Sequence, residues 1–118
     1  GKRSLRLFSR DRRWSKAHDQ IARVEMFLGN YNSAESYWAQ QLPERKAAFY
    51  IGFCAYMGKE YKRAIKEFSS LNEEDDGWTI AGQYWAGKAY SHLEMPIESK
   101  RSFDYVSQYD TVGWYKLF

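Results

Sequence analysis

Cysteine and histidine are scarce in this sequence, and long apolar runs are absent. Because Cys54 is the single cysteine, the chain cannot build a disulfide framework or a thiolate metal site of its own. The histidines, His18 and His92, do not combine with neighbouring carboxylates at metal-ligand spacing on one helix face. No apolar stretch approaches the roughly 20 residues that a membrane span needs. These shortages argue against a disulfide-rich, metal-binding or membrane-spanning chain.

The composition is that of a folded, soluble domain with many aromatic rings. Hydrophobic residues make up 44% of the 118 residues and charged residues 28%, which excludes a disordered chain. Residues 1–118 are enough for one helical domain, which we interpret as a fragment of a longer chain. The aromatic share of 19% suits helix interfaces in which large side chains pack on small ones. Core packing is therefore our first interpretation of the rings.

An internal repeat is the most informative feature of the sequence. Residues 47–68 and 82–103 carry the same order of large, small and aromatic positions, 35 residues apart. The first copy contributes Tyr50, Gly52, Ala55, Ala64 and Phe68, which recur as Trp85, Gly87, Tyr90, Ser99 and Phe103. A period near 35 is typical of stacked helical hairpins, and one hairpin cannot cover its own apolar face. The sequence therefore predicts an all-α fold, an α-solenoid of tetratricopeptide-like hairpins.

A third, weaker copy lies upstream and sets the number of repeats. Gly29, Tyr31, Ala34 and Trp38 align with Gly58, Tyr61, Ala64 and Phe68 at a step close to 30. The shorter step fits a tight link at Leu42 and Pro43, because surface loops change length at little entropic cost. We expect about three repeats, at roughly 14–42, 44–71 and 78–108.

The spacing of apolar residues and the positions of glycine and proline predict where the helices lie. Apolar residues at spacings of three and four mark a first helix with the stripe Trp14, Ala17, Ile21, Val24 and Leu28, which ends at Gly29 and Asn30. Further helices are expected at about 33–41, from Pro43 to Gly58, at 61–68, 78–93 and 96–106, with a loop at 73–76. The apolar residues 112–118 predict the start of another helix, and a docked C-terminal helix cap is the alternative. No alternating strand pattern competes with these helices.

Two mid-helix glycines need a structural reason. Glycine inside a helix costs about 1 kcal/mol relative to alanine. In a helical hairpin, the missing Cβ at Gly52 and Gly87 would admit the rings of Phe68 and Phe103 from the partner helix. We therefore expect each glycine to face its own phenylalanine.

Basic charge is concentrated at the start of the chain. Residues 1–16 hold seven Lys or Arg against the single acid Asp11, a net charge of +6, whereas the remainder has a net charge of −3. Such an arm can be attracted to nucleic acid, a membrane surface or an acidic cell-wall strand. Leu5, Leu7, Phe8 and Trp14 interleave the charges, as in a helix packed on one side. Nucleic-acid binding, which would weaken steeply with salt, is therefore our last choice.

The repeat resembles the tetratricopeptide family, and a second resemblance is sharper. The first is carried by the turn Gly58-x-x-Tyr61-x-x-Ala64 and the aromatic positions. The segments Ala81–Tyr90 and Trp114–Phe118 resemble the last helical repeat of soluble lytic murein transglycosylases. There a Tyr-Trp-x-Gly-Arg-Ala helix and an aromatic-Tyr segment precede the catalytic domain. In this sequence Lys88 stands in place of the arginine, and Lys116 stands in place of a glycine.

The resemblance implies a non-catalytic part of a catalytic protein. The family's lysozyme-like domain carries a Glu-Ser pair with Gly-Leu-Met-Gln and Ala-Tyr-Asn segments, and the last two do not occur here. Glu35-Ser36 reproduces the pair, but inside a helical repeat beside Ala34 and Trp38, where we expect a surface residue without catalytic function. No phosphate-binding glycine loop, calcium loop or Ser, His, Asp arrangement is recognisable. No cofactor is expected.

We expect the chain to hold or guide murein strands in the periplasm for a C-terminal catalytic domain. The resemblance implies peptidoglycan and that domain as partners. The candidate contact residues are the rings Trp78, Tyr84 and Trp114, expected to be exposed, and the basic residues Arg12 and Arg13. The alternative is a tetratricopeptide-like module that binds a peptide or partner protein in its groove.

Overall fold

The structure, a computed structural model, describes residues 12–109, with side chains described from residue 16 onward. This part of the chain forms six α-helices and one short 3-10 helix, and it contains no strand. The elements are α2 (Arg12–Phe27), α3 (Tyr31–Ala39), α4 (Arg45–Met57), α5 (Tyr61–Ser69), η1 (Ser70–Glu73), α6 (Gly77–His92) and α7 (Pro96–Ser107). The predicted all-α class is confirmed for the described residues. The further helix predicted at 112–118 lies outside them.

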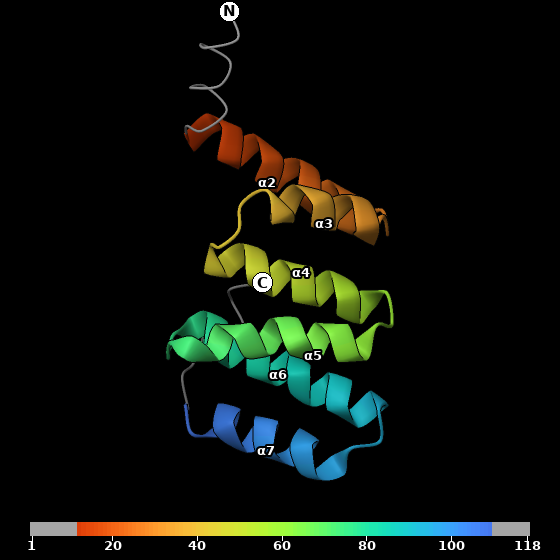
Figure 1. Cartoon of the computed structure of the whole chain (residues 1–118), viewed down its shortest axis with the longest axis vertical. Helices are drawn as coiled ribbons and strands as arrows, with labels where there is room; N and C mark the ends of the chain where they lie inside the picture. Colours follow the sequence, from red (N-terminus) through yellow and green to blue (C-terminus); the bar gives the residue numbers. More distant parts are fainter. Residues whose placement is uncertain (1–11, 110–118) are drawn as a thin grey trace, which may run out of the picture.

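Each helix packs on the next one in the chain. Figure 1 shows the helices stacked in sequence order along the long axis of the molecule, with the direction reversed from one to the next. Helices α2 and α3, α4 and α5, and α6 and α7 form three hairpins, and α4 also contacts α6. None of the helices within 12–109 combines the length and the apolarity that crossing a bilayer requires.

The three hairpins turn in the same way. The second residue after the first helix of each hairpin has a left-handed backbone, with φ of 84° at Gly29, 65° at Lys59 and 59° at Glu94. The next amide then donates to the carbonyl five residues earlier. These bonds run from Asn30 to Glu25 (2.8 Å), from Glu60 to Ala55 (2.8 Å) and from Met95 to Tyr90 (2.9 Å). The turns stand 30 and 35 residues apart, the same offsets that the sequence repeat shows.

The turn geometry corrects one detail of the sequence alignment. Gly29 was aligned with Gly58, but the structure places Lys59 at the left-handed position that Gly29 occupies in the first turn. Gly58 precedes that position and has an ordinary φ of −82°. The alignment was wrong by one residue. The first turn has its glycine at the position that needs positive φ, whereas the second turn has its glycine one position earlier.

Both mid-helix glycines face the predicted phenylalanine rings. A Cβ built on Gly52 would lie 2.8 Å from Phe68 Cε1, and one built on Gly87 would lie 2.9 Å from Phe103 Cζ. Cβ atoms do not approach ring carbons so closely. In the third hairpin the Ser99 hydroxyl also donates to the carbonyl of Gly87 (2.8 Å). The predicted reason for both glycines is therefore confirmed.

The core runs through the interfaces between hairpins. Its largest fully buried side chains include Trp38, Phe49, Phe68 and Leu71. Trp38 stacks on Tyr50 at 4.7 Å between ring centroids, which ties the first hairpin to the second. Phe49 meets Phe68 within the second hairpin (5.6 Å). The rings are thus used mainly for packing, as the composition suggested.

The apolar stripe expected on the first helix is largely exposed. Ile21, Val24 and Leu28 are 41%, 54% and 62% exposed, and the side chain of Trp14 lies outside the described residues. Thirty residues later, Ile51 and Cys54 are buried because α3 packs on α4. No helix precedes α2 among residues 12–109 to cover its stripe in the same way.

The helix ends match the prediction at Pro96 and differ from it at Pro43 and at the start of α3. Pro96 opens α7 as expected, whereas Pro43 lies before α4, which begins at Arg45. Helix α3 begins at Tyr31, two residues before the predicted start. In the acidic link, Glu73 ends η1 and Asp76 caps α6, accepting a hydrogen bond from the Thr79 amide (3.0 Å).

Candidate functional site

The described rings among the predicted contact residues are engaged in packing. Trp78 is half-buried, with its ring 5.5 Å from that of Phe49 and 6.1 Å from that of Tyr50. Tyr84 is also half-buried and lies 5.8 Å from the ring of Phe103. Neither ring is fully exposed, contrary to expectation, because neighbouring hairpins and helices use both of them as interface contacts.

The other three predicted contact residues are Arg12, Arg13 and Trp114. Arg12 and Arg13 belong to the first turn of α2, but their side chains lie outside the described residues, as does all of Trp114. A common site for all five residues therefore stays a prediction. A cavity lined by polar and aromatic side chains lies elsewhere on the same helix, α6.

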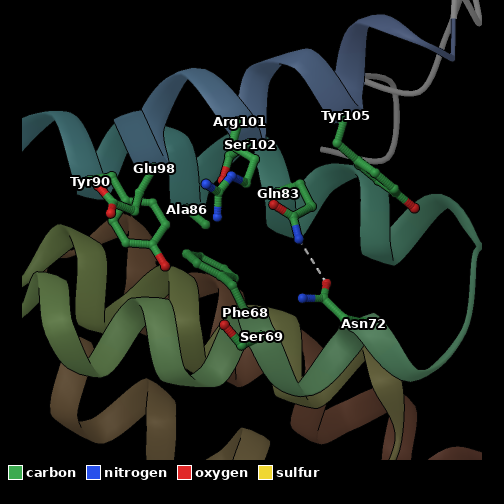
Figure 2. A pocket seen from close by; sticks show the side chains of 10 residues that line it. All are labelled: Phe68, Ser69, Asn72, Gln83, Ala86, Tyr90, Glu98, Arg101, Ser102 and Tyr105. Carbon is green, nitrogen blue, oxygen red and sulfur yellow. Dashed lines mark hydrogen bonds between the residues drawn. The ribbon is translucent and has the colours of Figure 1, made fainter. Parts of the chain in front are cut away.

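A polar and aromatic cavity of about 260 Å³ lies between α5, α6 and α7. Figure 2 shows side chains from these helices and from η1 pointing into the space. Phe68 and Ala86 form its floor, while Tyr90 and Tyr105 bring two further rings. The cavity also contains hydrogen-bonding groups of Ser69, Asn72, Gln83, Glu98, Arg101 and Ser102.

The polar groups of this cavity can both donate and accept hydrogen bonds. The Gln83 amide donates to the Asn72 side-chain oxygen (3.0 Å), which holds two planar amides at one wall. Arg101 is exposed and forms no ion pair with a described residue, so its guanidinium is available to a ligand oxygen. Planar amides, a guanidinium and tyrosine rings around a small cavity suit a polar ligand with flat apolar faces.

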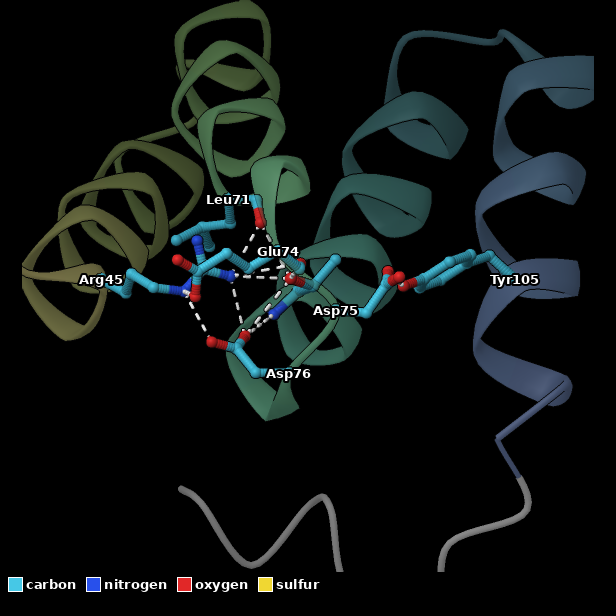
Figure 3. Close-up of polar contacts among 7 residues, drawn as sticks. Arg45, Leu71, Glu74, Asp75, Asp76 and Tyr105 are labelled. Carbon is cyan, nitrogen blue, oxygen red and sulfur yellow. Dashed lines mark hydrogen bonds and ion pairs between the residues drawn. The ribbon is translucent and has the colours of Figure 1, made fainter.

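Tyr105 links the cavity to the acidic segment before α6. Its hydroxyl donates to the Asp75 carboxylate (2.8 Å), as Figure 3 shows. Burial, the nearby Tyr109 hydroxyl and the Asp75 carboxylate all raise the pKa of Tyr105. The phenol therefore stays neutral over the physiological range and keeps its donor bond.

A second polar cluster fastens the hairpins to each other. Arg45 on α4 reaches across to the segment before α6, where its Nε donates to Asp76 (2.6 Å) and its Nη2 to the Leu71 carbonyl (2.8 Å) (Figure 3). Nη2 also contacts Thr79 Oγ1 (2.7 Å). The pKa of Asp76 falls from 3.8 to about 2, because Arg45 donates a hydrogen bond to the carboxylate and attracts its charge, and because the Thr79 amide donates to it as well. The cluster is a structural clamp, since its groups are all paired.

Glu35 is held in an ion pair and not in a catalytic cleft. Its carboxylate accepts hydrogen bonds from both terminal nitrogens of Arg63, one of them at 2.9 Å, and Arg63 also pairs with Glu60 at 2.7 Å. These carboxylates raise the pKa of the Arg63 guanidinium. Both oxygens of the Glu35 carboxylate are occupied by the Arg63 guanidinium. We expected Glu35 to be a surface residue, whereas its side chain is only 16% exposed because it pairs with Arg63 on α5.

The part of the chain that the structure describes contains no set of side chains arranged as metal ligands. No group of three or more His, Cys, Asp or Glu side chains is placed to hold a metal ion among residues 12–109. Cys54 is buried, and burial, followed by the charge of Glu35, raises the pKa of its thiol to about 12. That thiol is a core residue and a poor nucleophile.

Sequence reasoning missed the residues that line the cavity. Tyr90 belonged to the repeat pattern and was interpreted as a packing residue, whereas no motif singled out Arg101 or Ser102. The available signal was the combination of small Ser99 and Ser102 on α7 with Tyr90 on α6, since small residues leave space beside a ring.

Comparison of the chain with protein-family models, with curated proteins and with solved structures gave no match.

Proposed function

We propose that residues 12–109 form an α-solenoid of three tetratricopeptide-like hairpins. The glycine and phenylalanine pairs, Gly52 with Phe68 and Gly87 with Phe103, support this proposal because the same contact recurs 35 residues later. The three hairpin turns of one conformation add independent support. The repeats correspond roughly to residues 14–42, 44–71 and 78–108.

We further propose that the chain is the non-catalytic helical part of a periplasmic lytic murein transglycosylase, which holds murein strands for a C-terminal catalytic domain. The cavity in Figure 2 carries this proposal. It lies on the helix whose segment Ala81–Tyr90 resembles the family, and Gln83, Ala86 and Tyr90 of that segment line it. The pairing of Glu35 with Arg63 fits a chain that contributes no catalytic acid.

Each group of the cavity has a counterpart in murein chemistry. Sugar rings have flat C–H faces that stack on tyrosine, so Tyr90 and Tyr105 would contact a saccharide. Hydroxyl and acetamido groups pair with amides, which Asn72 and Gln83 supply. The carboxylates of the murein peptides would meet Arg101. A cavity of about 260 Å³ is of the size of one sugar unit, not of a long strand.

Sedimentation with purified insoluble murein tests this function. At low salt the wild-type chain should co-sediment, and Arg101→Ala and Tyr90→Ala should each reduce the bound fraction. Lys62→Ala is the matched control, because Lys62 is an exposed cation of α5 that does not line the cavity. Equal retention of all four proteins would place binding elsewhere on the chain, and no retention of the wild type would reject murein binding.

A protein-interaction module is the second candidate, and an apolar groove between α2 and α4 favours it. The full gene product separates the two candidates. A lysozyme-like domain with its glutamate after Phe118 would support the transglycosylase proposal, whereas further repeats or a stop there would support the interaction module.

A further inference from the structure

The groove between α2 and α4 is apolar and open. It encloses about 330 Å³ and is lined by Arg23, Met26, Phe27, Tyr31, Phe53 and Met57, with Tyr50 beside them. Phe27 is 91% exposed and Met57 is 42% exposed. Figure 1 places α2 and α4 at the start of the stack, away from the cavity between α5 and α7. Large apolar side chains at an open groove favour an apolar contact with a partner.

One positive charge distinguishes this groove from a purely apolar surface. Arg23 is the single charged residue that lines it, and its guanidinium lies 5.4 Å from the centre of the Tyr50 ring. No carboxylate lines the groove, and Arg23 has no ion pair with a described residue. The groove therefore offers a carboxylate a guanidinium that is already positioned over a ring.

The equivalent place one hairpin later shows what fills such a groove. By the offsets of 30 and 35 residues, Tyr31 corresponds to Tyr61, and Met57 corresponds to His92. Tyr61 stacks on the His92 ring with centroids 4.5 Å apart and planes 2° from parallel. Tyr31 has only the flexible Met57 at the corresponding position, so a flat ring from outside would take the place that His92 fills.

A second ring closes the later groove as well. Trp85 lies 5.1 Å from the ring of Phe53 and 5.3 Å from that of Tyr56. Its counterpart in the earlier groove is Tyr50, a smaller side chain. The protein thus fills the groove between α4 and α6 with its own rings and leaves space between α2 and α4.

We propose that the groove between α2 and α4 binds a peptide segment of a partner protein in which an aromatic side chain stands next to a carboxylate. The aromatic side chain stacks on Tyr31 and contacts Met26, Met57 and Phe27. The carboxylate pairs with Arg23. This inference goes beyond murein holding and does not rest on it, because the groove and the cavity between α5 and α7 share no lining residue.

The methionine methyl groups provide the test, because two of the three methionines line the groove. In the full chain labelled with 13C at the methionine methyls, the peptide acetyl-Ala-Phe-Asp-Ala-amide should shift the signals of Met26 and Met57 in a saturable way. Met95 lines a different cavity and should not respond. The peptide with Asn in place of Asp should bind about tenfold more weakly, as expected for loss of one charge-assisted hydrogen bond.

Variants assign the two halves of the interaction. Arg23→Gln should reduce binding of the Asp peptide to that of the Asn peptide. Lys62→Gln, which removes an exposed cation outside both cavities, should leave peptide binding unchanged. Absence of saturable shifts at Met26 and Met57 would overturn the proposal. So would equal binding of the two peptides, or displacement of the peptide by soluble murein fragments, which would assign the groove to the glycan.

Discussion

Phe68 packs so closely on Gly52 that a Cβ atom at residue 52 would stand 2.8 Å from Cε1 and 2.9 Å from Cδ1 of the ring. Phe68 is 1% exposed and also meets Phe49, so the ring has little freedom to withdraw. The pair Gly87 and Phe103 repeats this contact with a half-buried ring at the last described hairpin. The missing side chains at Gly52 and Gly87 thus set how closely α5 approaches α4 and how closely α7 approaches α6.

Gly52→Ala should therefore destabilise the protein, although alanine is the better helix former. Overpacking against a fixed ring costs about 1–3 kcal/mol, which outweighs the propensity gain of about 1 kcal/mol. Thermal unfolding followed by circular dichroism should show a melting temperature lower by several degrees, and Gly87→Leu should show a similar loss. Gly58→Ala is the control, since a Cβ there finds ordinary contacts of 3.4 Å or more. Unchanged melting of Gly52→Ala would contradict the packing role.

Acid should remove part of the stability through Asp76. Its pKa is 3.8 before folding and about 2 in the folded protein, so the folded state favours the ionised carboxylate. The contribution is complete above pH 4 and is lost as pH falls toward 2. The side chain is 36% exposed, so solvent screening reduces the expected contribution to about 1 kcal/mol.

Asp76→Asn isolates this contribution, because asparagine keeps an oxygen that can cap α6. The variant should be less stable than wild type at pH 7 by about 1 kcal/mol, and the difference should shrink as pH falls from 4 to 2. Chemical denaturation at several pH values measures both quantities. A constant difference across this range would mean that the charge of Asp76 contributes nothing.

Lys59→Gly should stabilise the protein. Lys59 has φ of 65°, a left-handed conformation that costs an L-residue about 1 kcal/mol and that Gly29 adopts freely in the equivalent turn. Part of that gain is offset by the greater entropy of glycine in the unfolded chain, so we expect a net gain of about 0.5 kcal/mol. Urea unfolding of Lys59→Gly and of Gly29→Ala should give changes of opposite sign. Destabilisation by both would show that the turns are not equivalent.

Cys54 should be inert in the folded protein. The thiol is 1% exposed and its pKa is raised to about 12, so neither access nor thiolate is available at pH 8. A thiol reagent such as 5,5′-dithiobis(2-nitrobenzoic acid) should label the chain only after denaturant unfolds it. Rapid labelling of the native protein at pH 8 would be inconsistent with a core position between α3, α4 and α5.

The sequence predicts the helices and the glycine contacts because both depend on local spacing. The offset of 35 residues places Gly87 against Phe103 once Gly52 is placed against Phe68, and no longer-range information is needed. The one-residue error at Gly58 arises because composition alone does not distinguish a residue with positive φ from its neighbour. Lys59 and Glu94 adopt that conformation without being glycine.

The candidate sites depend on contacts that spacing does not reveal. Trp78 and Tyr84 looked like free rings, but their exposure is decided by Phe49 on α4 and Phe103 on α7. Likewise, Arg101 and Arg23 differ from other basic residues in what surrounds them. Arg45 looked equally ordinary, yet it is fully paired with Asp76 and its neighbours. Which cations remain available to a ligand follows from the packing of several helices together.

The most direct test of the proposed function is a titration of the 15N-labelled chain with soluble murein glycan fragments, observed at the side-chain amides of asparagine and glutamine. Asn72 and Gln83 line the cavity between α5, α6 and α7, whereas Gln40 on the first hairpin does not. We predict saturable shifts of the Asn72 and Gln83 amides, with Gln40 unchanged, and loss of these shifts in Arg101→Ala. If the two cavity amides do not respond, or respond no more than Gln40, the cavity does not bind murein and the central proposal is wrong.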